Sequence, residues 1–378
     1  MKQNLSYRPT WAEIDLSALR FNYMQLMKFT KPGTEALAAV KADAYGHGAV
    51  MVSRVLGRCP GIRFLGVASS DEALWLRRNR IKLAILILGV INSRQEIKEV
   101  IKNNITPTIT SLKAAVRINN IAQRLGKIVK VHLKIDTGMG RIGFWHEDAG
   151  EIVPRIDKLK NIKIEGIYTH LSCADIDKRF TLQQIERFHR LVNMLEGAGV
   201  YIELKHAANS IGLCNYPESH FNLVRPGIML YGMYPKQQLC RRLKLKPVLS
   251  LHTRIAYLKK VLTGRAISYK ATFVTKGPAN IATLPIGYAD GYRRELSNHG
   301  RVIIRGKYAK IRGLICMDQT MVELKDIPNV REWDEVVLIG KNGKCKITAE
   351  ELAGRCGTIP YEITCGISQR VPRYYRDD

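Results

Sequence analysis

The chain has 378 residues, 46% of them hydrophobic, and its 60 Lys and Arg against 33 Asp and Glu give a formal charge of +27. It is long enough to bury one large core and a second, smaller one, and its longest apolar run, residues 83–91, is far shorter than the roughly 20 residues that cross a bilayer. Because the amino terminus lacks the apolar segment of a secretion signal and the basic residues are scattered without a nucleic-acid-binding motif, we expect a cytoplasmic protein with neither a membrane nor a specific nucleic-acid partner.

Short apolar runs rich in β-branched residues alternate with helical patterns through the first two-thirds of the chain. Runs of this kind, bounded by turn residues, are typical of buried parallel strands. The eight candidate strands span residues 35–42, 63–69, 84–89, 106–110, 130–136, 162–170, 202–208 and 221–227.

Helical patterns lie between these strands. Examples are residues 70–79, where Ser70 or Asp71 can cap the first turn, and residues 181–199, which end in glycine. Eight strand–helix units in roughly 230 residues are typical of a closed (β/α)8 barrel, whose usual length is roughly 250 residues. We therefore predict an α/β fold with this barrel over residues 1–240; an open, doubly wound sheet is the alternative.

The pattern changes after about residue 240, where strand-like runs follow one another with turns between them. Only residues 347–357 read as a helix, with Thr348 as a possible cap. We therefore predict a separate, mainly β domain over residues 241–378. Its candidate strands span residues 248–261, 279–287, 301–306, 309–317, 320–326 and 334–340.

The eight cysteines are spread along the chain without a C-x-x-C pair or a neighbouring group of histidines. A disulfide framework is typical of much smaller secreted chains, and a zinc site needs ligands that lie closer together in sequence. We therefore expect free thiols and no metal centre.

A single lysine stands at a position that is unusual for a basic side chain. In the stretch AVKADAYGHG (39–48), Lys41 closes the first predicted strand. The carboxyl ends of barrel strands carry the chemistry in folds of this kind. A partly desolvated lysine there can act as a nucleophile toward a carbonyl group and form a Schiff base.

The stretches after strands seven and eight, HAANSIGL and VRPGIMLYG, lie where such barrels often bind phosphate. Ser210 and the backbone amides of Gly227 and Ile228 are suited to that task. A helix cap and a plain turn would each explain one of these stretches alone, but together with Lys41 they indicate a phosphorylated aldehyde. Pyridoxal phosphate is the common cofactor of this class.

These motifs resemble those of the alanine racemase family, and the resemblance covers nearly the whole chain. It implies a fold-type III pyridoxal phosphate enzyme that works as a head-to-tail homodimer with active sites shared between subunits. The matching stretches, in chain order, are AVKADAYGHG, KIDTGMGRIG, THLSCAD, NSIG, VRPGIMLYG, ISYKATF, LPIGYADGYRR, ICMDQT and ISQRVPRYY.

Racemisation removes the α-hydrogen from one face of an amino acid and returns a proton to the other, so two acid–base groups must flank the substrate. The resemblance assigns these catalytic roles to Lys41 and to Tyr269, the latter supplied by the second subunit. It also implies that His170 shares a hydrogen-bond chain with this tyrosine. Because a phenol has a pKa of about 10, nearby cations must stabilise its deprotonated form. Without the resemblance, His170 reads as a core histidine and Tyr269 as a half-buried strand residue.

Three further basic residues have counterparts in the family. Arg225 resembles the arginine that faces the pyridine nitrogen of the cofactor. A guanidinium, with a pKa above about 12, does not readily give that nitrogen a proton, which favours simple proton return over side reactions. Arg141 resembles a residue near the cofactor's phenolic oxygen and the substrate carboxylate. Lys134 resembles a lysine that is carbamylated in many relatives; an unmodified lysine that reaches outward is the alternative.

The remaining residues implied by the resemblance bind either the cofactor or the substrate. The chain departs from the usual family pattern at Asp43, where asparagine is common, and at Lys270, where glycine is common; neither change removes a reacting group. As a strand neighbour of Tyr269, Lys270 is expected to point to the opposite face. The implied cofactor-binding residues are Tyr45, Asn209, Ser210, Gly227, Ile228 and Tyr361, and the implied substrate-binding residues from the second subunit are Tyr288, Met317 and Asp318.

The sequence therefore predicts an isomerase that interconverts L-alanine and D-alanine with pyridoxal phosphate and supplies D-alanine for peptidoglycan. A racemase of broader specificity, for instance for serine or lysine, is one alternative, and the pocket volume near Tyr361 and Met317 would distinguish it. A non-catalytic pyridoxal phosphate carrier is another. Such carriers resemble only the first domain and lack the ISYKATF-like tyrosine, so the second domain argues against this alternative. Two-domain decarboxylases share the architecture but match these motifs less well.

Overall fold

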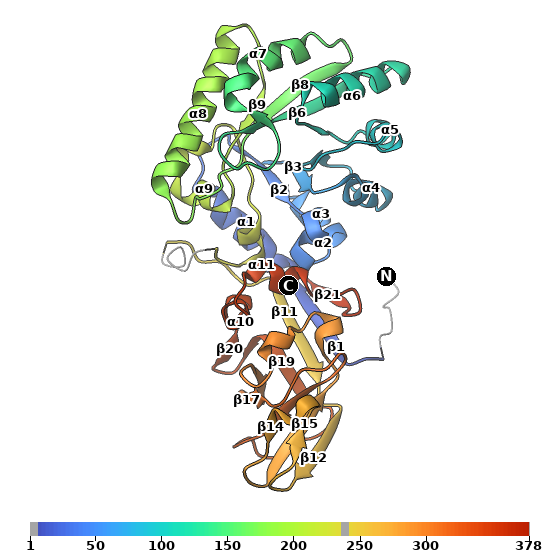
Figure 1. Ribbon diagram of the computed structural model, residues 1–378, viewed down its shortest axis with the longest axis vertical. Helices are drawn as coiled ribbons and strands as arrows, with labels where there is room; N and C mark the ends of the chain where they lie inside the picture. Colours follow the sequence, from blue (N-terminus) through green and yellow to red (C-terminus); the bar gives the residue numbers. More distant parts are fainter. Residues whose placement is uncertain (1–6, 236–241, 378) are drawn as a thin grey trace.

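The computed structural model describes residues 7–235 and 242–377 and consists of a strand–helix barrel joined to a mostly antiparallel sheet (Figure 1). Hydrogen bonds order four barrel strands as β10-β2-β3-β4 and the other four as β5-β6-β8-β9. A parallel bridge between Leu86 and Thr106 joins the two groups on one side, and Arg225 N–H donates to Ala208 O at 2.9 Å on the other. The closed ring confirms the predicted barrel and excludes the open sheet. The strands are β2 Glu35–Ala39, β3 Ile62–Val67, β4 Ala84–Ile87, β5 Thr108–Ile109, β6 Val129–Asp136, β8 Ile162–Tyr168, β9 Leu204–His206 and β10 Leu223–Val224, with β7 Phe144–Trp145 paired to β6.

Helices cover the outside of the barrel, and most begin at a side-chain cap. The prediction that Ser70 or Asp71 caps the helix after β3 was wrong. Ser69 is the cap, because its side chain accepts the hydrogen bond from Glu72 N–H, and the helix begins at Ser70. The barrel helices are α1 Leu16–Met27, α2 Lys41–Gly46, α3 Ala49–Leu56, α4 Ser70–Arg78, α5 Arg94–Lys102, α6 Leu112–Arg124, α7 His146–Asp157, α8 Lys178–Gly197 and α9 Ser210–Asn215, with 3-10 turns η1 Pro217–Ser219 and η2 Ile228–Tyr231.

The second part of the molecule is the mainly β unit predicted from the sequence. The run 248–261, predicted as one strand, forms two strands, because β11 pairs with β19 whereas β12 pairs with β15. Thr348 caps α10 as predicted. The elements are β11 Leu249–Arg254, β12 Tyr257–Val261, β13 Ala266–Ile267, η4 Tyr269–Ala271, β14 Phe273–Val274, β15 Ala279–Leu284, η5 Tyr288–Asp290, η6 Arg294–Leu296, β16 Arg301–Ile304, β17 Lys307–Ile311, β18 Thr320–Glu323, β19 Glu335–Asn342, β20 Cys345–Ile347, α10 Ala349–Arg355, α11 Pro360–Cys365 and β21 Arg373–Arg376.

Strand β1, Thr10–Asp15, belongs to the second sheet although it lies in the range predicted for the barrel. It runs antiparallel to β11 and parallel to β21. Asp15 then caps α1, which crosses to the barrel, and Asn22 of α1 bonds to Leu230 O at 3.0 Å and to Lys246 O at 2.7 Å. The chain therefore ties the two parts together from its first strand. The predicted boundary between residues 240 and 241 lies outside the described residues.

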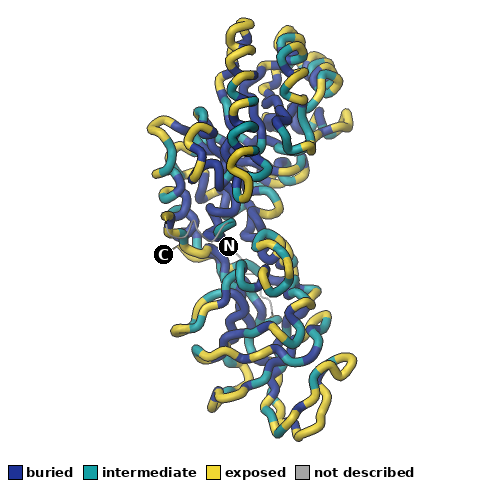
Figure 2. The backbone as a smooth tube through the Cα atoms, turned by 60° about the vertical axis from the view of Figure 1, so that its left-hand side comes forward, coloured by how far each residue is buried: buried dark blue, intermediate teal, exposed yellow. Residues whose placement is uncertain are grey.

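The hydrophobic core runs through both parts, and Figure 2 shows buried backbone along the interior of each. A separate cluster takes one buried side chain from each of five barrel strands, as expected for the interior of a packed barrel. No helix among the described residues is both long and apolar enough to cross a membrane. The five side chains of the separate cluster are those of Leu37, Phe64, Leu86, Leu204 and Leu223.

Candidate active site

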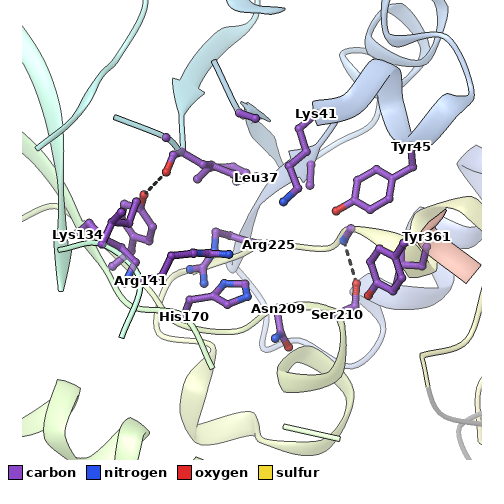
Figure 3. A pocket seen from close by; sticks show the side chains of 18 of the residues that line it. Leu37, Lys41, Tyr45, Lys134, Arg141, His170, Asn209, Ser210, Arg225 and Tyr361 are labelled. Carbon is purple, nitrogen blue, oxygen red and sulfur yellow. Dashed lines mark hydrogen bonds between the residues drawn. The ribbon is translucent and has the colours of Figure 1, made fainter. Parts of the chain in front are cut away.

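The carboxyl ends of the barrel strands surround a cavity of about 440 Å³. Residues predicted from distant parts of the sequence line it together, and in Figure 3 the Lys41 amine points into it opposite Arg225 and His170. The structure therefore brings together all the site residues predicted from the barrel and one, Tyr361, from the second part. The predicted residues that line it are Lys41, Tyr45, Lys134, Arg141, His170, Asn209, Ser210, Arg225, Gly227, Ile228 and Tyr361.

The turn that presents Lys41 is left-handed. The four residues that follow Lys41, from Ala42 to Tyr45, have φ values of 52°, 52°, 53° and 56°. Each such residue costs roughly 1–2 kcal/mol because the Cβ approaches the backbone, so neighbouring groups must hold the turn. Ala42 N–H donates to Glu72 Oε1 at 2.7 Å, and Asp43 Oδ1 accepts from Ala49 N–H at 2.7 Å. The strained turn fixes the lysine at the cavity.

The cavity carries an excess of positive charge. Burial lowers the pKa of Lys41, and Arg141 lowers it further, whereas Glu72 opposes the change. Burial also lowers the pKa of Lys134 to about 8, although Asp136 opposes this. A lysine with a lowered pKa has more of its amine in the neutral, nucleophilic form at neutral pH. The site therefore favours attack by an amine on a carbonyl group.

Arg225 is buried beside the cavity and is held by three hydrogen bonds. Its Nη2 donates to Thr169 O at 2.7 Å and to Ala207 O at 2.8 Å, and its Nη1 donates to His206 Nδ1 at 3.0 Å. Burial lowers its pKa to about 10, so the guanidinium stays charged at neutral pH. Its orientation is set by the barrel backbone and by one histidine.

The loop that carries Arg141 is organised by Asp136, at the end of β6. Asp136 Oδ1 accepts from Gly138 N–H and Met139 N–H, both at 2.8 Å, and its Oδ2 accepts from Arg141 N–H at 3.1 Å. The backbone of this loop is thereby wrapped around one carboxylate. His170, across the cavity, has a pKa well below its usual value because of burial and the surrounding cations, so its imidazole is neutral.

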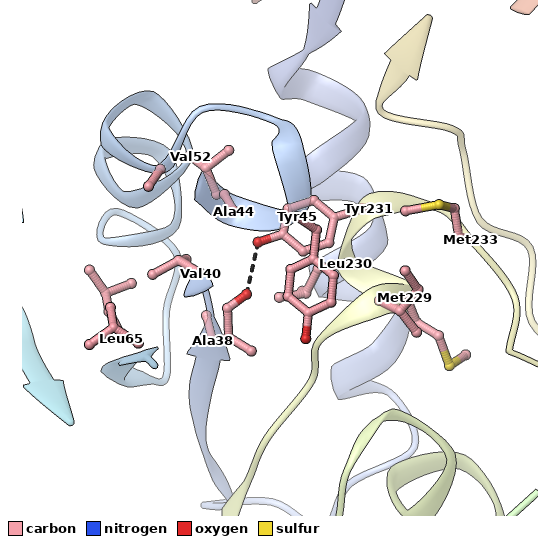
Figure 4. Packing of buried hydrophobic residues seen from close by; sticks show 14 of the residues in the cluster. Ala38, Val40, Ala44, Tyr45, Val52, Leu65, Met229, Leu230, Tyr231 and Met233 are labelled. Atoms are coloured by element: carbon pink, nitrogen blue, oxygen red, sulfur yellow. Dashed lines mark hydrogen bonds between the residues drawn. The ribbon is translucent and has the colours of Figure 1, made fainter. Parts of the chain in front are cut away.

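One end of the cavity is suited to a phosphate group. Gly227 N–H donates to Ser210 Oγ at 2.9 Å, and a Cβ at position 227 would lie 2.8 Å from Tyr45 Oη. The Tyr45 ring packs against Tyr231 at 4.9 Å (Figure 4) and against Tyr361 at 5.8 Å. Only glycine leaves this space open to a ligand. Asn209 lines the same end, but its side chain also caps α9 by accepting from Gly212 N–H at 3.0 Å.

The other predicted site residues lie elsewhere, on the second part of the molecule. Tyr269 and Tyr288 line a separate hollow of about 770 Å³, and neither lines the Lys41 cavity. Tyr269 is 67% exposed and Met317 is 54% exposed. Asp318 is paired to Arg370 at 2.6 Å. Within one chain, the structure therefore does not bring this group to Lys41.

Tyr269 was expected on a strand, and this prediction was wrong. It lies in the turn η4 between the short strands β13 and β14, where Lys270 has a φ of 61°. Successive side chains point to opposite faces only along a strand. The expectation that Lys270 points to the face opposite Tyr269 therefore does not apply. The β-branched residues on both sides of the turn made the stretch read as continuous.

Several residues that organise the cavity were not predicted. Tyr168, on β8, lines the cavity and stacks on His206 with ring centroids 4.7 Å apart. Glu72 and Asp136 act on the backbone of the two loops described above. The only sequence signal for them was their position, since Asp136 ends a predicted strand, Tyr168 lies two residues before the end of another, and Glu72 lies in the first turn of a helix.

Pyridoxal phosphate, expected from the sequence, fits the groups that line the cavity. The Lys41 amine with its lowered pKa is suited to bond to the aldehyde, and Gly227 leaves room for the phosphate beside Ser210 and Tyr45. An anionic ligand would balance the excess positive charge of Lys41, Lys134, Arg141 and Arg225. Three independent features therefore agree with this cofactor.

Comparisons with known proteins identify the family. The family model described as alanine racemase, N-terminal domain, matches residues 14–235, and the one described as alanine racemase, C-terminal domain, matches residues 248–375. The chain is 45% identical to an alanine racemase of Halothermothrix orenii over 98% of this chain and 97% of that protein. It is also 45% identical to one of Methanococcus maripaludis, over 97% of this chain and 98% of that protein.

Solved structures agree with this family assignment. The alanine racemase of Clostridium difficile 630 superposes with a TM-score of 0.93 at 40% identity and covers 99% of this chain and 97% of that chain. The alanine racemase of Bacillus anthracis with bound L-Ala-P superposes with a TM-score of 0.92 at 36% identity, over 99% of this chain and 96% of that chain.

The charge on Glu72 offers a test of the reactive amine. We expect Glu72→Gln to lower the pKa of Lys41 further, because the carboxylate that favours the protonated amine is removed. The amine reacts with aldehydes above its pKa, so the midpoint pH for reaction of the cofactor-free protein with pyridoxal phosphate should move lower. Absorbance changes over a pH series measure the midpoint. Asp71→Asn, exposed on the same helix, is the control and should leave it unchanged; a midpoint that moves higher contradicts the assignment to Lys41.

Proposed function

The chain belongs to the alanine racemase family, and from that premise we propose that Lys41 and Tyr269 are the two proton carriers of its active site. The family reaction is the pyridoxal-phosphate-dependent interconversion of L-alanine and D-alanine, which supplies D-alanine, and the chain is such a racemase. The observation that carries the proposed roles is the Lys41 amine, which faces a cationic cavity beside the fixed guanidinium of Arg225.

Pyridoxal phosphate, when bound, supplies an electron-withdrawing ring that makes the α-hydrogen of an attached amino acid acidic. Tyr45, Ser210, Gly227 and Tyr361 would hold its phosphate, and Arg225 would donate an N–H group to the ring nitrogen. Lys41 Nζ removes or returns the α-proton on one face of the substrate. The lowered pKa of this amine suits it to accept a proton at neutral pH.

The opposite face of the substrate requires a second acid–base group, and we assign it to Tyr269 of the partner subunit. Two observations support a homodimer with shared sites. The tyrosines that line the Lys41 cavity, Tyr45, Tyr168 and Tyr361, have pKa values raised by burial, which makes them poor bases, whereas Tyr269 and Tyr288 stand exposed in a hollow of the second part. A two-fold pair of chains, each offering both surfaces, completes two equivalent sites. Met317 lies beside the Tyr288 turn, since Ala289 N–H donates to Met317 O at 3.0 Å. Met317 and Asp318 would line the pocket for the substrate carboxylate, whose charge Arg141 would balance.

We also propose that the chain works in the cytoplasm. The support is chemical: the seven cysteines in the described part of the chain are free thiols. Free thiols persist in a reducing compartment. Fractionation of the producing cells would test the location, and recovery of the protein outside the cytoplasmic fraction would contradict it.

We propose further that Lys134 carries a carbamate. It is 2% exposed, its Nζ donates to Ile135 O at 2.6 Å, and burial together with Arg225 and Arg141 lowers its pKa to about 8. A neutral amine attacks carbon dioxide, forming a nitrogen–carbon bond and releasing a proton. The resulting anion would balance the two arginines.

Native mass spectrometry in carbonate-containing buffer tests this modification. The wild-type chain should carry the added mass of one carbon dioxide, because a buried carbamate is protected from exchange. Lys134→Met should lose this mass, whereas Lys163→Met, at an exposed position of β8, should keep it. A wild-type chain without the added mass contradicts the proposal.

Tyr269→Ala tests whether Lys41 and Tyr269 each act on one face of the substrate. We expect it to slow loss of the α-proton from L-alanine by roughly a hundredfold or more, because general base catalysis on that face is removed, and to slow loss from D-alanine much less. Exchange of the α-hydrogen in deuterated water, followed by NMR from each enantiomer, measures both rates. Tyr257→Ala, an exposed tyrosine of β12, is the control. Equal slowing from both enantiomers counts against two separate bases.

Mixed dimers test whether the site is shared. Lys41→Ala and Tyr269→Ala chains, each inactive alone, should regain roughly a quarter of the wild-type activity when co-expressed, because half of the dimers are mixed and each mixed dimer has one intact site of two. Separate affinity tags allow the mixed species to be isolated and assayed for alanine racemisation. If the isolated mixed dimer is as inactive as its parents, both groups act within one chain and the shared site is wrong.

A further inference from the structure

A row of buried polar side chains crosses the barrel interior behind the cavity. It starts at Arg225 after β10, continues through His206 on β9 and His132 on β6, and ends at Glu165 on β8. His132 and His206 are both 0% exposed and Glu165 is 2% exposed. Buried polar groups of this kind are costly unless each has a partner, so their arrangement is informative.

The first contact fixes the position of one proton. Arg225 Nη1 and His206 Nδ1 are 3.0 Å apart, and a guanidinium has only donors. His206 Nδ1 must therefore accept. The pKa of His206 is well below its usual value because of burial and Arg225, so the ring is neutral and its single proton is on Nε2.

The second contact fixes the proton of the next histidine, His132, in the same way. His206 Nε2 lies 2.9 Å from His132 Nδ1, so the Nε2–H group donates and His132 Nδ1 accepts. Burial lowers the pKa of His132 as well, and its proton is likewise on Nε2. A Cβ at position 166 would lie 2.5 Å from the His132 ring, so Gly166 provides the space for it.

The row ends at a carboxylate. His132 Nε2 is 3.8 Å from Glu165 Oε2, slightly beyond hydrogen-bond distance, and neither atom has a hydrogen-bond partner in the described part of the chain, so the two buried groups are left to pair with each other. Glu165 Oε1 accepts from Lys130 Nζ at 2.5 Å, and the Lys130 side chain is 55% exposed. Burial raises the pKa of Glu165, but His132 and Lys130 outweigh this and lower it to about 2. The Glu165 carboxylate is therefore ionised, and can only accept hydrogen bonds, at every physiological pH.

We propose that Glu165 is a positioning residue for Arg225, and that it acts by fixing the Nε2–H tautomer of His132 and, through it, of His206. The opposite tautomer of His206 would point an N–H group at the guanidinium and push it away. With three N–H groups of Arg225 committed to Thr169, Ala207 and His206, its Nε–H and one Nη1–H remain for the cavity. The importance of these two donors for the reaction rests on the role proposed above for Arg225.

Glu165→Gln gives a sharp test because it is nearly isosteric. The Lys130 ammonium takes the amide oxygen, so the amide NH2 group faces His132 Nε2. This donor disfavours the Nε2–H tautomer of His132 and thereby disrupts the hydrogen bonds from His132 through His206 to Arg225. Adding Lys130→Met frees the amide to turn its oxygen toward His132, which restores the original direction. Lys130→Met alone leaves the carboxylate in place and serves as the control.

NMR of the holoenzyme labelled with ¹⁵N-histidine reports the tautomers, with His132→Gln and His206→Gln used for assignment. We expect protons on Nε2 of both histidines in the wild type, in Lys130→Met and in the double variant, and a proton on Nδ1 of His132 in Glu165→Gln. The cofactor absorbance should change and kcat should fall about tenfold or more in Glu165→Gln, with KM little changed, and both should recover in the double variant.

An Nδ1–H tautomer at either histidine of the wild type overturns the proposal. So does a Glu165→Gln variant with wild-type tautomers and kcat, or a double variant that does not recover. The tautomers are measured without any assay of racemisation. Loss of the proposed catalytic roles would therefore leave the NMR result standing, and an NMR failure would leave the racemase activity intact.

Discussion

Four basic side chains, those of Lys41, Lys134, Arg141 and Arg225, share one cavity, and the rest of the site depends on how their charge is balanced. Burial removes water from these groups and lowers the pKa of Lys41, Lys134 and Arg225. The nearest acids, Glu72 and Asp136, are occupied with backbone N–H groups of two loops. An anionic ligand therefore completes the balance, which accounts for the fit of a phosphorylated cofactor and an amino acid carboxylate. Burial and the same positive field lower the pKa of His170, so that it contributes a neutral imidazole rather than another charge.

The strained turn after Lys41 is built against the carboxyl-terminal residues of the chain. A Cβ at Gly46 would lie 2.1 Å from Thr364 O, and one at Gly48 would lie 1.8 Å from Tyr375 Oη. Both glycines also have positive φ values, so the close approach and the backbone conformation require the same residue type. The second part of the molecule therefore does more than offer a surface to another subunit. It holds in place the turn that aims the reactive lysine in its own chain.

Much of this architecture could be predicted from the sequence, because the barrel strands are short apolar runs between clear turn signals. All eight were found, as was the change to a mainly β part. The cap at Ser69 was missed because three candidate residues stand in a row, and Tyr269 was placed on a strand because its neighbours favour one. Cofactor-facing residues such as Lys41 and Ser210 lie in motifs with a chemical rationale. In contrast, the row from Arg225 to Glu165 joins four strands distant in sequence, and no local pattern reveals which buried histidines meet across a barrel.

Strand β1 is paired on both sides by strands that come much later in the chain, β11 and β21. On the ribosome it is made before either partner, and it emerges with two open edges long before Leu249–Arg254 and Arg373–Arg376 have been synthesised. The barrel can close in the meantime, since none of its own strands needs β1. An open strand edge is a template for pairing with other chains. The nascent protein must therefore keep β1 apart from other chains until Arg373–Arg376 has been made, and insertion of β1 into the sheet is a late event in its maturation.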